Sequence, residues 1–172
     1  MKRFAITSRT LASLALAVTC LTYAQSRAEG QVQFVLAQDL VKQNTENGKP
    51  VEVIIPSPQA VMPGDILREE VTLKNVSGKA LNNVQVSVPV PRGTEFTGNA
   101  SLNRSRWNLL YSADNGKTFS ETPTHTVTVT ENGKTVTKKV TAPTGTYTNV
   151  RWIVPTLKPD ESLKLSFRVK VK

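Results

Sequence analysis

The side chains that could do chemistry in this chain are few and far apart. The one histidine, His125, lies in the polar stretch 122–126, and the one cysteine, Cys20, lies near the N-terminus. A nucleophilic triad needs a base beside its nucleophile, and a zinc site needs several His or Cys ligands. The sequence offers neither set. We therefore interpret His125 as an ordinary exposed loop or strand residue.

The acidic residues are not arranged for catalysis either. Glycosidases need two facing carboxylates, but Glu69 and Glu70 are adjacent and would point to opposite faces of a strand. Phosphate-cradling Gly-rich loops are missing too. A calcium site built from scattered turn oxygens is the alternative that the sequence leaves open. Its candidate ligands lie in predicted turns: Asp114, Asn115, Asp160 and Glu161. The sequence predicts a protein that is not an enzyme and needs no cofactor.

Basic side chains are the residues best able to contact a partner. The last predicted strand projects Lys164, Arg168, Lys170 and Lys172 from one face, and a second group consists of Lys134, Lys138 and Lys139. Such a face could bind an anionic polymer of the cell envelope or a partner protein. Lysines on an edge strand also prevent edge-to-edge aggregation and then need no ligand. We favour this second reading for the last strand.

The two tryptophans allow a similar pair of interpretations. Trp107 and Trp152 could form a platform for a sugar ring, or they could fill the core of a sandwich. One tryptophan in each half of a sandwich is ordinary core material. We therefore expect both side chains to pack inside the protein.

The stretch 63–96 indicates how these residues are positioned. Apolar and polar residues alternate through residues 66–73, turn-forming residues follow at 75–78, and alternation resumes over 81–90. This pattern predicts a strand, a turn and a second strand that ends at Pro89 and Pro91, because proline cannot donate to a central ladder. We interpret the stretch as one edge of a sandwich of antiparallel sheets.

Further strands are expected along the rest of the chain. Residues 32–41 have a mixed pattern for which a helix is the alternative, but the hairpin signal at Asn47-Gly48 that follows favours a strand. The remaining predictions are a strand over 51–55, a strand over 106–112, a threonine-rich hairpin around Asn132-Gly133, a strand over 146–154 closed by Pro155, and a strictly alternating strand over 163–171. No amphipathic helix of useful length is predicted after the N-terminal segment. We therefore expect one all-β antiparallel sandwich domain of roughly seven to ten strands over residues 31–172.

Several turn motifs resemble a known family. They are Pro63-Gly64-Asp65, the strand and turn 71–78, Asn83-Val84, the stretch 89–96, Trp152 and the stretch 157–162. Together they resemble the conserved repeat domain of bacterial surface proteins, an immunoglobulin-like family of unknown function. Asp160 stands where that family prefers glycine, and one copy is present where many members carry tandem arrays. The resemblance implies an immunoglobulin-like sandwich at the cell surface or in the periplasm, with no catalytic residue to transfer.

A second, shorter motif covers residues 112–119. The sequence SADNGKTF resembles the Asp-box of sialidases and related propellers. The motif occurs once, without repeats at blade spacing, which argues against a propeller. Asp114 can accept hydrogen bonds from its own turn, Gly116 can adopt positive φ, and Phe119 can return to the core. We expect a local hairpin.

The N-terminal segment has the pattern of an export signal. Lys2, Arg3 and Arg9 precede an apolar run over 11–21, and a small-residue site ends at Ala24. This pattern predicts a secretory signal peptide over residues 1–24, with cleavage after Ala24 and a flexible lead-in over 25–30. The run is shorter than the roughly 20 apolar residues that a membrane span needs. Lipidation of Cys20 is the alternative to its removal with the signal.

These observations favour an exported, non-catalytic module. After cleavage 148 residues with a formal charge of +6 would remain, without cysteine and therefore without a disulfide. An exported basic domain meets envelope polymers and envelope proteins, whereas nucleic acid is not an expected partner. The sequence predicts a structural or binding module of the bacterial cell envelope, in the periplasm or at the surface. The alternatives are a periplasmic accessory or chaperone-like protein that works by strand addition, and a carbohydrate-binding module.

Overall fold

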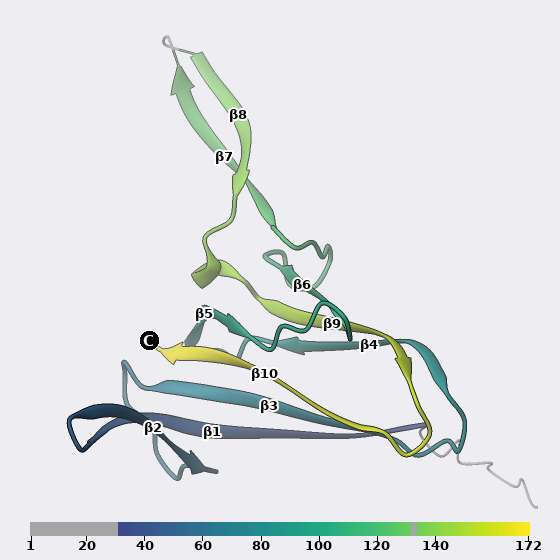
Figure 1. Ribbon diagram of the computed structural model, residues 1–172. Helices are drawn as coiled ribbons and strands as arrows, with labels where there is room; N and C mark the ends of the chain where they lie inside the picture. Colours follow the sequence, from purple (N-terminus) through teal and green to yellow (C-terminus); the bar gives the residue numbers. More distant parts are fainter. Residues whose placement is uncertain (1–30, 132–133) are drawn as a thin grey trace, which may run out of the picture.

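The protein is built almost entirely from antiparallel β-strands. The computed structural model describes residues 31–131 and 134–172. The strands are β1 (Val32–Glu46), β2 (Lys49–Pro56), β3 (Ile66–Asn75), β4 (Leu81–Pro89), β5 (Thr94–Ala100), β6 (Asn108–Ser112), β7 (Thr124–Glu131), β8 (Lys134–Thr141), β9 (Asn149–Leu157) and β10 (Ser162–Val171), and a short 3-10 helix η1 (Thr144–Thr146) precedes β9 (Figure 1). The predicted all-β class is therefore confirmed.

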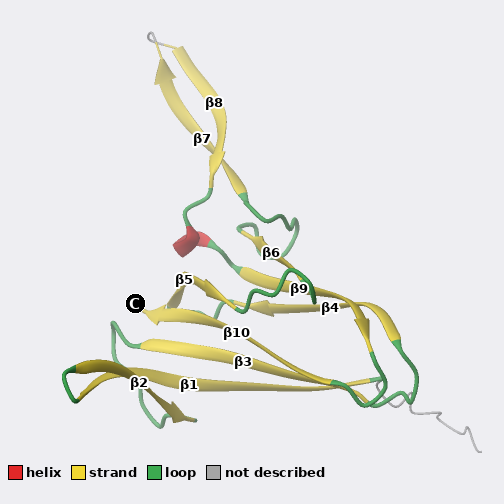
Figure 2. Cartoon of the chain, in the orientation of Figure 1, coloured by secondary structure: helices red, strands yellow, loops and turns green. Residues whose placement is uncertain are grey.

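Two sheets share one hydrophobic core. The larger has the order β2-β1-β3-β10-β5, and the smaller has the order β4-β9-β6 (Figure 2). Val71, Leu165 and Phe167 of the larger sheet join Val150 and Trp152 of the smaller one in a single cluster, and each is at most 1% exposed. This arrangement is compatible with a β-sandwich, because each sheet buries its apolar face against the other.

Alternation in the sequence explains which faces are buried. In β3 every second residue from Leu67 to Asn75 is buried, and in β10 Leu165, Phe167 and Val169 are buried between more exposed neighbours. Successive side chains of a strand point to opposite faces, so one face of each strand lies in the core. Glu69 and Glu70 accordingly point to opposite faces, as predicted.

The larger sheet is folded over at one end. The turn Asn47-Gly48, with φ of 51° and 76°, connects β1 to β2 as the sequence predicts. β1 and β3 separate β2 from β10 in the sheet order, yet Glu52 of β2 binds Arg168 of β10. The β1–β2 hairpin therefore curls over the outer face of the larger sheet.

Three expectations about strand placement are wrong. The stretch 63–96 is not one edge of the sandwich, because β3 is an inner strand of the larger sheet whereas β4 belongs to the smaller one. β10 is an inner strand between β3 and β5, so its lysines do not protect an edge. β9 continues through Pro155 to Leu157, because the partner strand β6 begins only opposite Ile153 and leaves the position of Pro155 without a ladder on that side.

The threonine-rich hairpin forms a sheet of its own. β7 and β8 pair only with each other, with Glu131 opposite Lys134, and the hairpin projects away from the two core sheets (Figure 1). The predicted turn Asn132-Gly133 lies outside the described residues, as do the predicted signal peptide and the lead-in over 25–30. Among residues 31–131 and 134–172, no helix is long and apolar enough to span a bilayer.

Candidate functional site

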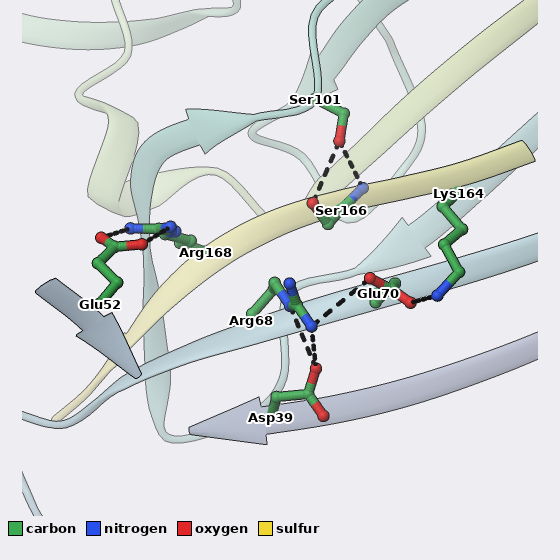
Figure 3. Close-up of polar contacts among 8 residues, drawn as sticks. All are labelled: Asp39, Glu52, Arg68, Glu70, Ser101, Lys164, Ser166 and Arg168. Atoms are coloured by element: carbon green, nitrogen blue, oxygen red, sulfur yellow. Dashed lines mark hydrogen bonds and ion pairs between the residues drawn. The ribbon is translucent and has the colours of Figure 1, made fainter. Parts of the chain in front are cut away.

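The basic residues of β10 lie in a network of ion pairs. Lys164 Nζ is 2.7 Å from Glu70 Oε1, and the guanidinium of Arg168 makes two hydrogen bonds of 2.7 Å with Glu52 (Figure 3). Arg68 binds Asp39 at 2.7 Å in the same region. These acidic partners neutralise much of the charge that the sequence suggested for this face.

The remaining predicted basic residues are spread over two places. Lys170 and Lys172 are exposed near the end of the chain, while Lys134, Lys138 and Lys139 lie on the projecting strand β8. The fold does not gather the two groups on one surface, because β8 belongs to a separate sheet. Contact of these lysines with a polyanion stays a prediction.

The carboxylate of the turn residue Asp114 is used within the fold. Asp114 accepts hydrogen bonds from Ser112 Oγ at 2.7 Å, from Thr118 N at 2.9 Å and from Thr118 Oγ1 at 2.6 Å. The hydrogen bonds from Thr118 hold the pKa of the Asp114 carboxyl well below its usual range. Among the described residues, no three His, Cys, Asp or Glu side chains are grouped to hold a metal ion.

The motif of residues 112–119 is a local hairpin turn, as expected. Asn115 and Gly116 have φ of 60° and 78°, and Tyr111 and Ser120 form a bridge that closes the turn. Phe119 is only partly buried, and the guanidinium carbon of Arg151 lies 3.4 Å from the centre of its ring. Phe119 therefore anchors a cation–π contact with β9.

The two tryptophans have different environments but share one acceptor. Trp152 is 0% exposed and lies in the core, whereas Trp107 is partly buried. Both indole N–H groups donate to the carbonyl oxygen of Ser101 at 3.1 Å. The expectation of core packing is confirmed for Trp152, which cannot be part of a sugar platform.

Trp107 lines a groove beside β5 and β6. The groove has a volume of about 380 Å³, and its other lining residues include Leu102, Arg104, Tyr111 and Glu121. Aromatic rings with a few polar side chains around them are typical of small-ligand sites. This groove is the second candidate site of the protein.

The open edge of β1 is the strongest candidate for a functional surface. Residues 32–41 of β1 pair with β3 on one side, but β2 pairs only with residues 39–46 on the other side. Residues 32–38 of β1 are therefore an edge, here called the open β1 edge. Along it Phe34, Val35 and Leu36 are each 50–51% exposed. An exposed apolar edge strand is a template for pairing with another strand.

Phe34 and Leu36 are exposed although they point to the core side of the sheet. They lie opposite Leu73 and Val71 of β3, which are 1% and 0% exposed. The larger sheet has five strands and the smaller sheet three, so the core does not cover the inner face of β1 at these positions. The open β1 edge thus offers unpaired backbone groups next to uncovered apolar side chains.

Sequence reasoning identified β1 as a strand but did not identify its edge as a site. The available signal was the composition of residues 31–38, QVQFVLAQ, which contain no charge, no proline and no glycine. Charged side chains and prolines are features by which natural edge strands resist pairing. The tertiary structure determines how far β2 pairs along β1. The extent of this pairing decides which residues of β1 keep unpaired backbone groups.

Comparison with protein-family models, with curated proteins and with solved structures found no match. The resemblance to the conserved repeat domain of bacterial surface proteins therefore rests on the turn motifs quoted above and stays a prediction.

Proposed function

We propose that this protein is an exported, non-catalytic module of the bacterial cell envelope that binds a protein partner by strand addition along the open β1 edge. The observation that carries the proposal is the exposed, uncharged and unpaired edge of residues 32–38. In strand addition, backbone hydrogen bonds supply affinity and alternate side chains supply selectivity. We also infer that the sandwich-like core is immunoglobulin-like, in keeping with the turn motifs.

Strand addition accounts for more of the structure than a basic polymer-binding face does. The positive charges on the outer face of β10 are neutralised by the carboxylates of Glu52 and Glu70. A polyanion would have to displace these carboxylates before it could bind Lys164 or Arg168. The open β1 edge needs no such rearrangement, since residues 32–38 already present their backbone and side chains.

A position-specific crosslinking experiment tests the proposal. A photoreactive amino acid is placed at Leu36 in the exporting cell, and the matched control carries it at Leu102, another exposed leucine, which is 59% exposed. We expect protein adducts at position 36 and far fewer at position 102. Mass spectrometry then identifies the crosslinked peptide.

A charge-reversal variant provides the competing test. Lys164, Lys170 and Lys172 are changed to Glu together, and association with purified wall polymer is measured at low and high salt. If wild-type binding to the polymer were salt-sensitive and lost in this variant, while no protein crosslinked at position 36, polymer binding through the basic face would replace strand addition as the function.

The groove beside Trp107 supports carbohydrate binding as a second candidate function. An aromatic ring and neighbouring polar side chains, such as those of Tyr111, Arg104 and Glu121, match the mixed apolar and polar surface of a sugar. Trp107→Ala should then abolish binding to an envelope glycan in an affinity assay. Binding that is unchanged in this variant would remove the groove from consideration.

A further inference from the structure

We infer that the strand that adds to the open β1 edge is β1 of a second copy of this chain, in an antiparallel pair centred on Phe34. This inference rests on the proposed function and names its partner. The resulting assembly has a two-fold axis at Phe34 and joins the two larger sheets into one continuous sheet. Such an interface uses the same surface on both copies.

The direction of the backbone groups in β1 determines which residues can pair. The carbonyl of Gln31 accepts a hydrogen bond from Val76 N at 3.0 Å, on the β3 side, and the carbonyl of Gln38 accepts one from Ser57 N at 3.2 Å, on the β2 side. Backbone groups alternate in direction along a strand. The N–H and C=O groups of Val32, Phe34 and Leu36 therefore point to the open side.

Those three residues select one register. With Phe34 opposite Phe34 of the second copy, Val32 lies opposite Leu36, and each pair can exchange two hydrogen bonds, which gives about six in total. A register centred on Val35 would bring Val32 opposite Gln38. Ser57 N already occupies that side of Gln38 through its hydrogen bond to the Gln38 carbonyl, so the Val32–Gln38 pairs are blocked and that register keeps only the Phe34–Leu36 pairs, about four bonds.

The side chains of the same three residues in the two copies would match each other across the two-fold axis. Val32, Phe34 and Leu36 all point to the inner face of the sheet, since they lie opposite Asn75, Leu73 and Val71. In the proposed register they would form one apolar band across the two-fold axis. Burial of Phe34 and Leu36, each half exposed in the single copy, would supply the driving force.

The electrostatics near the edge permit two copies to approach. Residues 31–75 contain four basic and six acidic residues, a net charge of −2, although residues 76–172 carry a net charge of +8. The segment 31–38 itself is uncharged. The basic charge of the chain therefore lies mainly outside the strands that would meet.

The other edge strands of the two core sheets carry features that oppose such pairing. β2 has prolines at positions 50 and 56, β4 contains Asn83 with φ of 54°, and β5 joins β10 through a register shift. β6 is five residues long. Prolines, bulges and short length are the usual protections of an edge, and residues 32–38 lack them.

Sedimentation equilibrium of the full protein, purified as the cell processes it, measures the self-association. We expect a dimer, and we expect Leu36→Lys to weaken dimerisation on the order of 100-fold, since each copy loses one apolar contact and gains a charge. Leu102→Lys is the matched control and should dimerise like the wild type. Circular dichroism of both variants establishes that they are folded.

Cysteine pairing tests the register. Phe34→Cys should form a disulfide-linked dimer under mild oxidation, because the paired Cα atoms would be about 5.5 Å apart, within the range of a disulfide. Leu36→Cys alone should not, since its two copies would be about 14 Å apart along the strands. A mixture of Val32→Cys and Leu36→Cys chains should link. The wild type under the same oxidation controls for Cys20.

The outcomes distinguish this inference from the proposed function. A wild-type monomer at all concentrations, together with crosslinking of a different protein at position 36, would overturn the second copy as partner and leave strand addition standing. A dimer that is unaffected by Leu36→Lys and unlinked in Phe34→Cys would overturn the inference as well. The absence of any protein adduct at position 36 would overturn both.

Discussion

Glu52 and Arg168 are 116 residues apart in the chain, yet they form a bidentate ion pair. Nη1 and Nη2 of Arg168 each donate a hydrogen bond of 2.7 Å to one carboxylate oxygen of Glu52. Figure 3 shows the carboxylate of Glu52 facing the guanidinium of Arg168 across the outer side of the larger sheet. The pair connects the β1–β2 hairpin to β10, two elements that do not pair through their backbones. It therefore helps to determine where the hairpin lies, and so where β1 is left open.

Removal of this ion pair should loosen the hairpin without unfolding the core. In the Glu52→Gln variant we expect faster amide hydrogen exchange in β2 (Lys49–Pro56), with little change in β3 or β9. The effect should be small, because the two side chains are 40% and 30% exposed and are screened by solvent. Gln43→Ala, which removes a hydrogen bond to Glu52 and leaves the ion pair intact, is the control. Equal exchange in the wild type and the Glu52→Gln variant would contradict this role.

Glu69 should lower the free energy of unfolding as the pH rises, whereas an ion-paired acid raises it. Burial raises the pKa of its carboxyl, while a hydrogen bond from Gln38 at 2.6 Å partly offsets this effect. Because the folded-state pKa is above the unfolded one, the folded protein holds the proton more tightly, and the contribution of Glu69 to stability falls as pH rises between the two values.

The Glu69→Gln variant tests this pH dependence. It keeps the acceptor for Gln38 and removes the charge, so it should be more stable than the wild type at neutral pH. The difference should vanish below about pH 4, near the pKa of an unfolded glutamate. Urea unfolding at several pH values measures it. Glu70→Gln, on the outer face, should not stabilise the protein, because Glu70 pairs with Lys164. A Glu69→Gln variant less stable than the wild type at pH 7 would show that the charged form is favoured inside the protein.

Trp152 should contribute far more to stability than Trp107. Trp152 is 0% exposed and lies 6.2 Å from Phe167 between ring centres, so Trp152→Ala should cost about 3–5 kcal/mol of unfolding free energy. Trp107→Ala should cost less, since Trp107 is only partly buried and lines the groove. Chemical denaturation followed by far-UV circular dichroism compares them. Equal losses would mean that Trp107 is also a core residue.

Asn75 should be a point of unusual sensitivity in the fold. Its side chain is buried, and Nδ2 lies 2.7 Å from the carbonyl of Lys79, 3.0 Å from that of Leu157 and 2.9 Å from that of Lys158. Asn75→Ala should cost about 1–3 kcal/mol through the lost hydrogen bonds. Asn75→Asp should cost more at neutral pH, because a carboxylate would face three carbonyl oxygens.

The control for Asn75 is the same substitution at an exposed site. Asn99 is exposed, so Asn99→Asp should leave the denaturation midpoint nearly unchanged. Lowering the pH should reduce the gap between Asn75→Asp and Asn75→Ala, since the protonated carboxyl regains a donor. A gap that does not depend on pH would indicate that steric change, rather than charge, accounts for the loss.

Only part of the candidate site could be predicted from the sequence. The uncharged segment 31–38 can be read directly, and its apolar residues predicted a strand. Its exposure could not be predicted, because it depends on β2 pairing no further along β1 than Asp39 and on the smaller sheet leaving Phe34 and Leu36 uncovered. The acidic partners of Lys164 and Arg168 could not be predicted either, because they lie on β3 and β2, which are far from β10 in the sequence.

The sequence by itself determined the elements: the alternation of β3 and β10, the turn at Asn47-Gly48 and the hairpin turn around Asp114 all follow from neighbouring residues. Side-chain alternation and turn chemistry are local, so a short window contains them. Only the tertiary structure decided that β3 and β4 belong to different sheets, that β10 is an inner strand and that β1 has an open edge. Strand neighbours are chosen by long-range burial and hydrogen bonding, which no local pattern encodes.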